Sequence, residues 1–250
     1  AYDELIELIV KVIRTQFIAI IGNISLAAPI ALGLAWLWFN QLGEHVIGLE
    51  KADKMLADLA PIAGNGIFHA AIAGCCLFLA GLISGYYDNK SLYNQIPQRI
   101  AALPLLNKLL GNRRTHLFAQ YIENNLGALA GNFYFGIMLG SIGTIGFLLG
   151  LPIDIRHITF SAANLSYAIV AYDFALAWPI VAWGVAGVAL IGVTNLLVSF
   201  SLALWVALRS RKRTMRELKP LWRLVGRRFL SRPIDFFIAP KTPVSSTEAA

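Results

Sequence analysis

The chain has 250 residues, of which 57% are hydrophobic and only 14% are charged. A soluble domain carries charge at about 25% of its positions, so the composition argues against a soluble globular domain. The charges are also unevenly placed, because residues 124–153 and 174–208 contain no Asp, Glu, Lys, Arg or His. About 20 apolar residues in a helix cross the ~30 Å hydrocarbon layer of a bilayer. The sequence therefore predicts an all-α, polytopic transmembrane helical bundle.

The first predicted span follows a short segment whose apolar residues recur at helical spacing. Pro29 is expected to kink this span, and Trp36, Trp38 and Phe39 close it as an interfacial aromatic belt does. Three further apolar runs follow along the chain. The four full spans are predicted at about residues 17–39, 66–86, 126–151 and 179–208, within a transmembrane domain of residues 1–208.

Two polar connectors separate the first three spans. The connector 40–65 is expected to form a short surface helix in its central part. The connector 88–123 contains an apolar stretch, 100–110, that is too short to cross the membrane and is flanked by basic residues. This stretch is either an amphipathic interfacial helix or an ordinary helix packed on its neighbours.

The third span is unusually rich in glycine, often at a spacing of four residues. In lipid, small residues on one helix face let a second helix approach closely. The spacing predicts a helix-packing face, and the alternative is a face that lines a pore or a substrate path. The glycines assigned to this face are Gly127, Gly131, Gly136, Gly140, Gly146 and Gly150.

Charge determines the expected topology. The tail, residues 209–250, holds eleven Lys and Arg against three Asp and Glu, and the connector 88–123 holds five Lys and Arg. Basic segments stay on the cytoplasmic side, so an even number of crossings should separate these two. Spans 126–151 and 179–208 already supply two. Residues 158–177 are therefore expected to form a re-entrant or short fifth membrane segment, and a full fifth crossing that breaks the charge rule is the alternative.

Polar groups close to this segment are the candidate functional residues. Asp173 is either an intramembrane carboxylate, which is expensive and usually functional, or a turn residue at the membrane surface. Asp154 is expected to pair with Arg156, in a cluster that is either an ordinary surface feature or a gate. The candidates are Asn132, Asp154, Arg156, His157, Asn164 and Asp173, and the expected partners of Asp173 are Arg156, His157, Asn132 or Asn195.

No motif for catalysis, cofactor binding or metal binding is found. The four histidines and the adjacent Cys75 and Cys76 lack the spacing of metal ligands. The glycines lie inside an apolar span, which is unlike the loops that cradle phosphates. No catalytic residue, cofactor or metal is therefore assigned.

Five stretches carry a resemblance to a known family: Asn132-Phe-Tyr-Phe-Gly-Ile-Met-Leu-Gly140, Gly143-Thr-Ile-Gly146, Leu148-Leu-Gly-Leu-Pro152, Asp154-Ile-Arg-His157 and Phe160-Ser-Ala-Ala-Asn164. They resemble the C-terminal membrane region of a bacterial Gcr-type family called "site-specific recombinase", most closely over residues 126–175. Members are longer proteins of Gram-negative bacteria, so the resemblance implies a piece of a longer inner-membrane protein. The charge bias predicts that the C-terminal tail lies on the cytoplasmic side of that membrane.

The family name implies DNA strand exchange, but the resemblance carries over no nucleophilic Tyr or Ser with its arginines. The first hypothesis is therefore a non-enzymatic scaffold, or a passage for a small or lipidic solute. The second is the membrane anchor of a DNA-processing protein, and the third is a lipid-modifying enzyme that uses Asp173 or His157 as acid or base. Expected partners are the bilayer, anionic headgroups at the basic tail, and a second copy or another membrane protein. Nucleic acid is the alternative partner of the tail.

Overall fold

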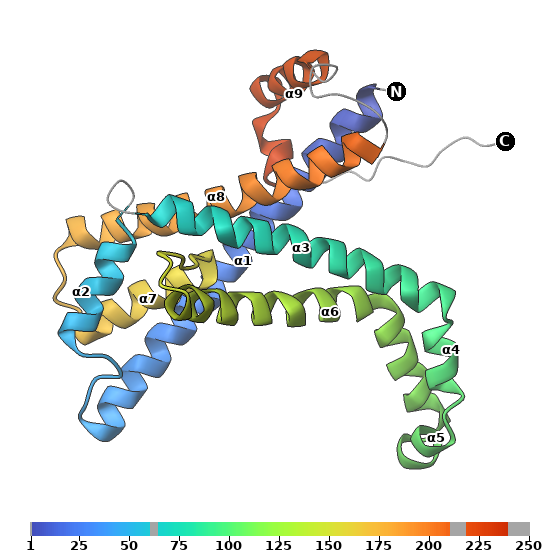
Figure 1. Ribbon diagram of the computed structural model, residues 1–250, viewed down its shortest axis with the longest axis horizontal. Helices are drawn as coiled ribbons and strands as arrows, with labels where there is room; N and C mark the ends of the chain where they lie inside the picture. Colours follow the sequence, from blue (N-terminus) through green and yellow to red (C-terminus); the bar gives the residue numbers. More distant parts are fainter. Residues whose placement is uncertain (1, 61–64, 211–218, 240–250) are drawn as a thin grey trace. The chain divides into compact units, whose positions relative to one another are not determined.

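The computed structural model describes residues 2–60, 65–210 and 219–239, and every regular element in these residues is helical (Figure 1). This confirms the predicted all-α class. The long helices are α1 (Tyr2–Leu42), α3 (Gly66–Tyr93), α6 (Asn112–Leu148) and α8 (Trp178–Ser210). The shorter ones are α2 (Leu49–Asp58), α4 (Ile96–Ala101), α5 (Pro104–Leu110), α7 (Ile158–Ala171), α9 (Lys219–Ser231) and a 3-10 turn at Pro233–Phe236.

Four of the described helices are long and apolar enough to cross a membrane: Ile9–Leu42, Gly66–Tyr93, Asn112–Leu149 and Trp178–Ser210. Large apolar side chains stay exposed on each of them, such as Leu26 at 66%, Phe68 at 57%, Phe133 at 66% and Trp183 at 52%. Soluble proteins rarely expose extended apolar surfaces of this kind. These faces therefore contact lipid, and the chain is a membrane-embedded protein.

Helix α7 is apolar but has only 14 residues, which span about 21 Å at 1.5 Å per residue. That length is shorter than the ~30 Å hydrocarbon layer. The predicted combination of four long spans and one short apolar segment is confirmed. Whether α7 re-enters the side from which it came stays a prediction.

The chain divides into two compact units. The first contains the described residues within 1–64, 158–192 and 203–250, and the second contains residues 65–157 and 193–202. In the first unit α7 packs against α1 and α2. The Ser166 hydroxyl donates to the Ala28 carbonyl of α1 at 2.9 Å, and Ala168 is fully buried. Small residues thus let α7 sit close to its neighbours.

The described part of the basic tail, residues 219–239, contains α9 and the 3-10 turn. The apolar face of α9 packs against the beginning of α1, and Arg228 joins Glu7 at 3.1 Å and Asp235 at 2.9 Å. The Arg211–Arg213 cluster lies outside the described residues. The buried cluster consists of Ile6, Ile9, Val10, Leu221, Val225 and Phe236.

The second unit is built on an antiparallel pair, α3 and α6. Gly131 of α6 faces Ala80 and Ser84 of α3, and Gly127 faces Asp88, so rising numbers in one helix meet falling numbers in the other. A Cβ at Gly131 would lie 3.1 Å from the Ala80 carbonyl oxygen. The two backbones therefore approach as small residues permit in membrane helices.

Candidate functional site

Residues 151–157, which we call the strap, connect α6 to α7 without regular secondary structure. Hydrogen bonds tie the strap to two helices. The Arg156 N–H donates to the His69 carbonyl at 3.3 Å, and His69 Nε2 donates to the Pro152 carbonyl at 3.2 Å. Asn195 of α8 is 3% exposed, and its Nδ2 donates to the carbonyls of Ala70 at 2.7 Å and Arg156 at 2.9 Å. One amide thus joins α8, α3 and the strap.

The predicted partners Asp154 and Arg156 do form an ion pair, with Arg156 NH1 lying 2.5 Å from Asp154 Oδ2. The other carboxylate oxygen, Oδ1, accepts the Ile155 N–H at 2.8 Å. The Arg156 side chain is only 16% exposed. Buried charges need such partners, because an unpaired charge costs several kcal/mol. This pair therefore neutralises the charges of the strap where they meet the helices.

His157 closes the strap and is 8% exposed. Its ring meets Phe135 of α6 edge to face, with centroids 5.1 Å apart. Burial lowers the pKa of the imidazole from its ordinary 6.5 to about 4, because desolvation penalises the charged form. His157 is therefore neutral near pH 7 and contributes packing at this position.

The predicted packing glycines occupy different surroundings. A side chain on Gly127 would clash with the Asp88 carboxylate, and one on Gly146 would clash with the Ile153 carbonyl of the strap. Together with Gly131, these positions allow close contact within the second unit. The contact at Gly127 is polar, since its N–H donates to Asp88 Oδ1 at 3.0 Å.

Within the described residues, the remaining glycines of this set do not face other protein atoms. Gly136 and Gly140 have nothing within 4 Å of an added Cβ, and Gly150 adopts a left-handed φ of +65° just after α6. Asn132, one turn before Gly136, is exposed. A packing role for Gly136 and Gly140 stays a prediction. Asn164 is half-buried within α7.

Asp173 lies in the turn after α7, where both it (φ +50°) and Phe174 (φ +61°) adopt left-handed backbone. Its carboxylate is 67% exposed and lies 3.4 Å from His45 Nε2. The His45 ring stacks on Phe39 with centroids 4.2 Å apart. The sequence analysis did not single out His45, since no local pattern marks a partner over 120 positions away.

The neighbouring Tyr172 donates a short hydrogen bond to the Asp53 carboxylate of α2. This bond is the main reason that the pKa of the Tyr172 phenol is raised, with burial as the second cause. The polar contacts of Asp173 and Tyr172 thus connect the end of α7 to the connector after α1. They were missed because neither Asp53 nor His45 stands in a recognisable motif.

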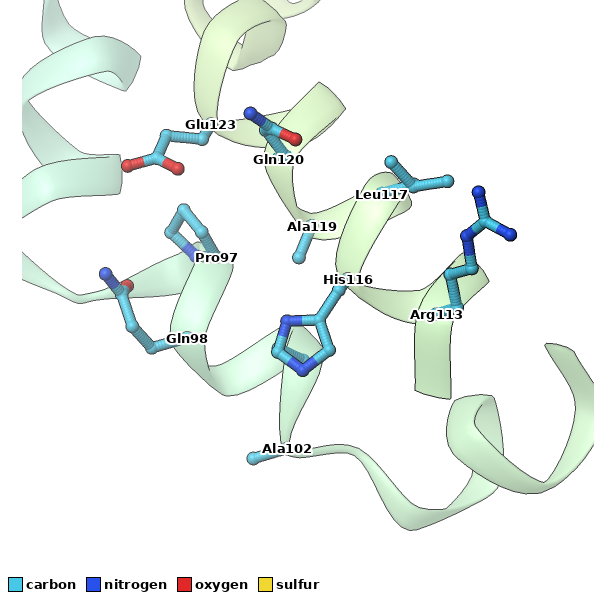
Figure 2. A pocket seen from close by; sticks show the side chains of 10 residues that line it. Pro97, Gln98, Ala102, Arg113, His116, Leu117, Ala119, Gln120 and Glu123 are labelled. Carbon is cyan, nitrogen blue, oxygen red and sulfur yellow. The ribbon is translucent and has the colours of Figure 1, made fainter. Parts of the chain in front are cut away.

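A cleft of about 770 Å³ lies between α4 and the first part of α6 (Figure 2). His116 points toward α4 in this view, and Glu123 lies at the opposite end of the cleft from Arg113. No cluster of three or more His, Cys, Asp or Glu that could hold a metal occurs in the described part of the chain. The lining residues include Pro97, Gln98, Arg113, His116, Gln120 and Glu123.

Comparison with known proteins identifies the family of the chain. No curated protein and no solved structure matches the chain. The family model described as "Site-specific recombinase" matches residues 1–239, which is nearly the whole chain. The match includes the strap and the glycine-rich helix α6, so the resemblance inferred from those residues is confirmed. The chain belongs to the site-specific recombinase family.

Proposed function

We propose that the chain is a non-enzymatic scaffold of the bacterial inner membrane, with residues 209–250 on the cytoplasmic side. The observation that carries this proposal is that the polar groups of the strap bind other groups of the protein. Asp154 and Arg156 neutralise each other, and the Arg156 carbonyl is bonded to Asn195. Polar groups that are directed at the protein's own backbone rigidify a structure and favour one arrangement of its helices.

The state of His157 supports the same proposal. A general base at neutral pH works best with a pKa near the operating pH, whereas burial holds the pKa of His157 at about 4. The Asp173 carboxylate, which is the other candidate acid or base, is largely exposed beside His45. These surroundings favour a structural role for both residues over acid–base chemistry on a lipid.

A charge exchange tests the scaffold directly. Asp154→Arg combined with Arg156→Asp keeps an ion pair in the strap but moves each charge to the other position. A scaffold requires only the pair. The double variant should therefore regain both the membrane assembly and the correction of the deletion-strain phenotype that Asp154→Arg alone loses. If the double variant folds and assembles but leaves the phenotype uncorrected, the identity of the groups matters and the scaffold proposal is wrong.

A second candidate is passage of a small or lipidic solute along α6. The observation that favours it is a face of small and polar residues, Asn132, Gly136 and Gly140, that meets no protein atom near the two glycines. Gly136→Leu should block such a passage without unfolding the protein. Unchanged uptake or release in proteoliposomes would exclude it. Cross-linking of Gly136→Cys to itself would instead identify this face as a contact between two copies.

DNA processing is the competing hypothesis, because the name of the family implies DNA strand exchange. The basic tail would supply the phosphate contacts, and such binding weakens steeply with salt. Titration of purified protein with duplex DNA at low and high salt separates the hypotheses. Tight binding at low salt that is lost on replacing Arg223 and Arg227 by Gln would support a DNA role over a purely membrane-bound scaffold.

A further inference from the structure

We propose that residues 96–123 form an interfacial arm that binds the surface of an anionic lipid leaflet. The arm, as defined here, contains α4, α5 and the first third of α6. It is directly continuous with the α3/α6 pair, whose helices are long and apolar enough to cross the membrane. The proposal does not depend on the scaffold function.

The direction of the arm follows from a bend in α6. Figure 1 shows the first part of α6 turning away from the part that runs beside α3. Just after the arm in the sequence, the Asp88 carboxylate accepts the Gly127 N–H at 3.0 Å, and Asn125 Nδ2 donates to the Tyr121 carbonyl at 2.8 Å. Side chains that enter the helical hydrogen-bond ladder bend helices. When the α3/α6 pair crosses the bilayer, the bend turns the arm toward the plane of the membrane surface.

Helix α5 has the side chains of a lipid-facing element. None of its residues is buried, and Leu105 and Leu109 are 68% and 70% exposed. They are four residues apart and therefore lie on one face of the helix. Lys108, in the last turn, is also exposed. Apolar residues beside a cation are typical of helices that lie in the headgroup region.

The first turns of α6 also combine exposed apolar side chains with cations. Thr115 and Ala119 are buried at 0% and 4% exposure, where α6 packs against α4. The other side exposes Leu117 at 57% and Phe118 at 42%. The exposed cations Arg113 and Arg114 begin the same helix. Apolar surface and positive charge thus continue from α5 into α6.

The charge of the arm identifies the lipid class. Residues 96–123 contain four Lys and Arg and a single acidic residue, Glu123. Each cation near an anionic surface gains about 1 kcal/mol, which corresponds to roughly a fivefold preference. Duplex DNA would satisfy the same cations but leave the exposed leucines in water. A leaflet that contains phosphatidylglycerol accommodates both kinds of side chain, so it is the partner that fits the whole surface.

A depth measurement on the full chain tests the arm. Cys75 and Cys76 are replaced by Ala, Leu109→Cys receives a nitroxide label, and the protein is placed in nanodiscs with or without phosphatidylglycerol. The label should be accessible to oxygen and shielded from a water-soluble nickel chelate when phosphatidylglycerol is present. The matched position is Lys54→Cys on α2, an exposed site that should remain accessible to the chelate in both lipids.

A charge variant tests the lipid class. Arg113→Gln with Arg114→Gln should reduce the ratio of shielded to exposed label by up to about 30-fold, since two cations are lost. Lys51→Gln with Lys54→Gln removes two charges elsewhere and should leave the ratio unchanged. A label at position 109 that meets the chelate equally in both lipids overturns the proposal. Protection of the arm by duplex DNA, with the label still in water, would identify a nucleic-acid surface instead.

Discussion

Removing the side chain amide of Asn195 should destabilise the second unit. Asn195 is 3% exposed, and its Nδ2 holds the carbonyls of Ala70 and Arg156 at 2.7 and 2.9 Å. A hydrogen bond contributes about 0.5–1.5 kcal/mol net, and bonds between membrane helices average about 0.6 kcal/mol. Two lost bonds and a small cavity should therefore lower the free energy of unfolding by about 2 kcal/mol in Asn195→Ala.

A second substitution separates hydrogen bonding from side chain volume. Asn195→Asp keeps the size of the side chain but directs a carboxylate oxygen at two carbonyl oxygens, which is an unfavourable contact between acceptors. If the amide acts as a donor, the Asp variant should be less stable than the Ala variant. If only the volume matters, the Asp variant should resemble the native protein.

Unfolding in mixed micelles with increasing sodium dodecyl sulfate, followed by circular dichroism, measures the effect. Asn125→Ala is the matched control, because Asn125 also donates to a carbonyl but is only half-buried and bonds within its own helix at 2.8 Å. That change should cost less than about 0.5 kcal/mol. Equal losses for the variants at positions 195 and 125 would refute the assignment of Asn195 as the central contact of the strap.

Three further predictions concern other parts of the described structure. Gly146→Ala should destabilise by about 1–3 kcal/mol by pushing the strap away, whereas Gly136→Ala, in open space, should be neutral or stabilising in the same titration. The pKa of His157 is about 4 when folded and 6.5 when unfolded, so the unfolded chain binds the proton more readily. Stability should fall by up to about 3 kcal/mol from pH 6.5 to pH 4, and His157→Gln should flatten this dependence in unfolding curves at several pH values. Leu221→Asp, at a site 2% exposed, should release α9 from α1 and speed its proteolysis, while Leu230→Asp, at a site 83% exposed, should not.

The structure changes how the polar residues of the chain are understood. Asp154 and Arg156 pair as their spacing suggests, but the group that holds the strap in place is Asn195, which had been considered only as a partner of Asp173. The Asp173 carboxylate instead lies 3.4 Å from His45 Nε2. Local spacing predicts a pair two residues apart, whereas contacts across 39 or 125 positions depend on how the helices pack.

The sequence by itself determined the all-α class, the four long spans and the short apolar segment at α7. These follow from hydrophobic length alone, because a helix must satisfy its own backbone within lipid and needs about 20 apolar residues to cross it. Tertiary structure decided which glycines face protein. Gly127 and Gly136 look alike in sequence, yet one contacts Asp88 and the other meets open space. Glycine spacing shows which residues share one face of a helix, but it does not show which helix packs against that face. The packing partner depends on residues far along the chain.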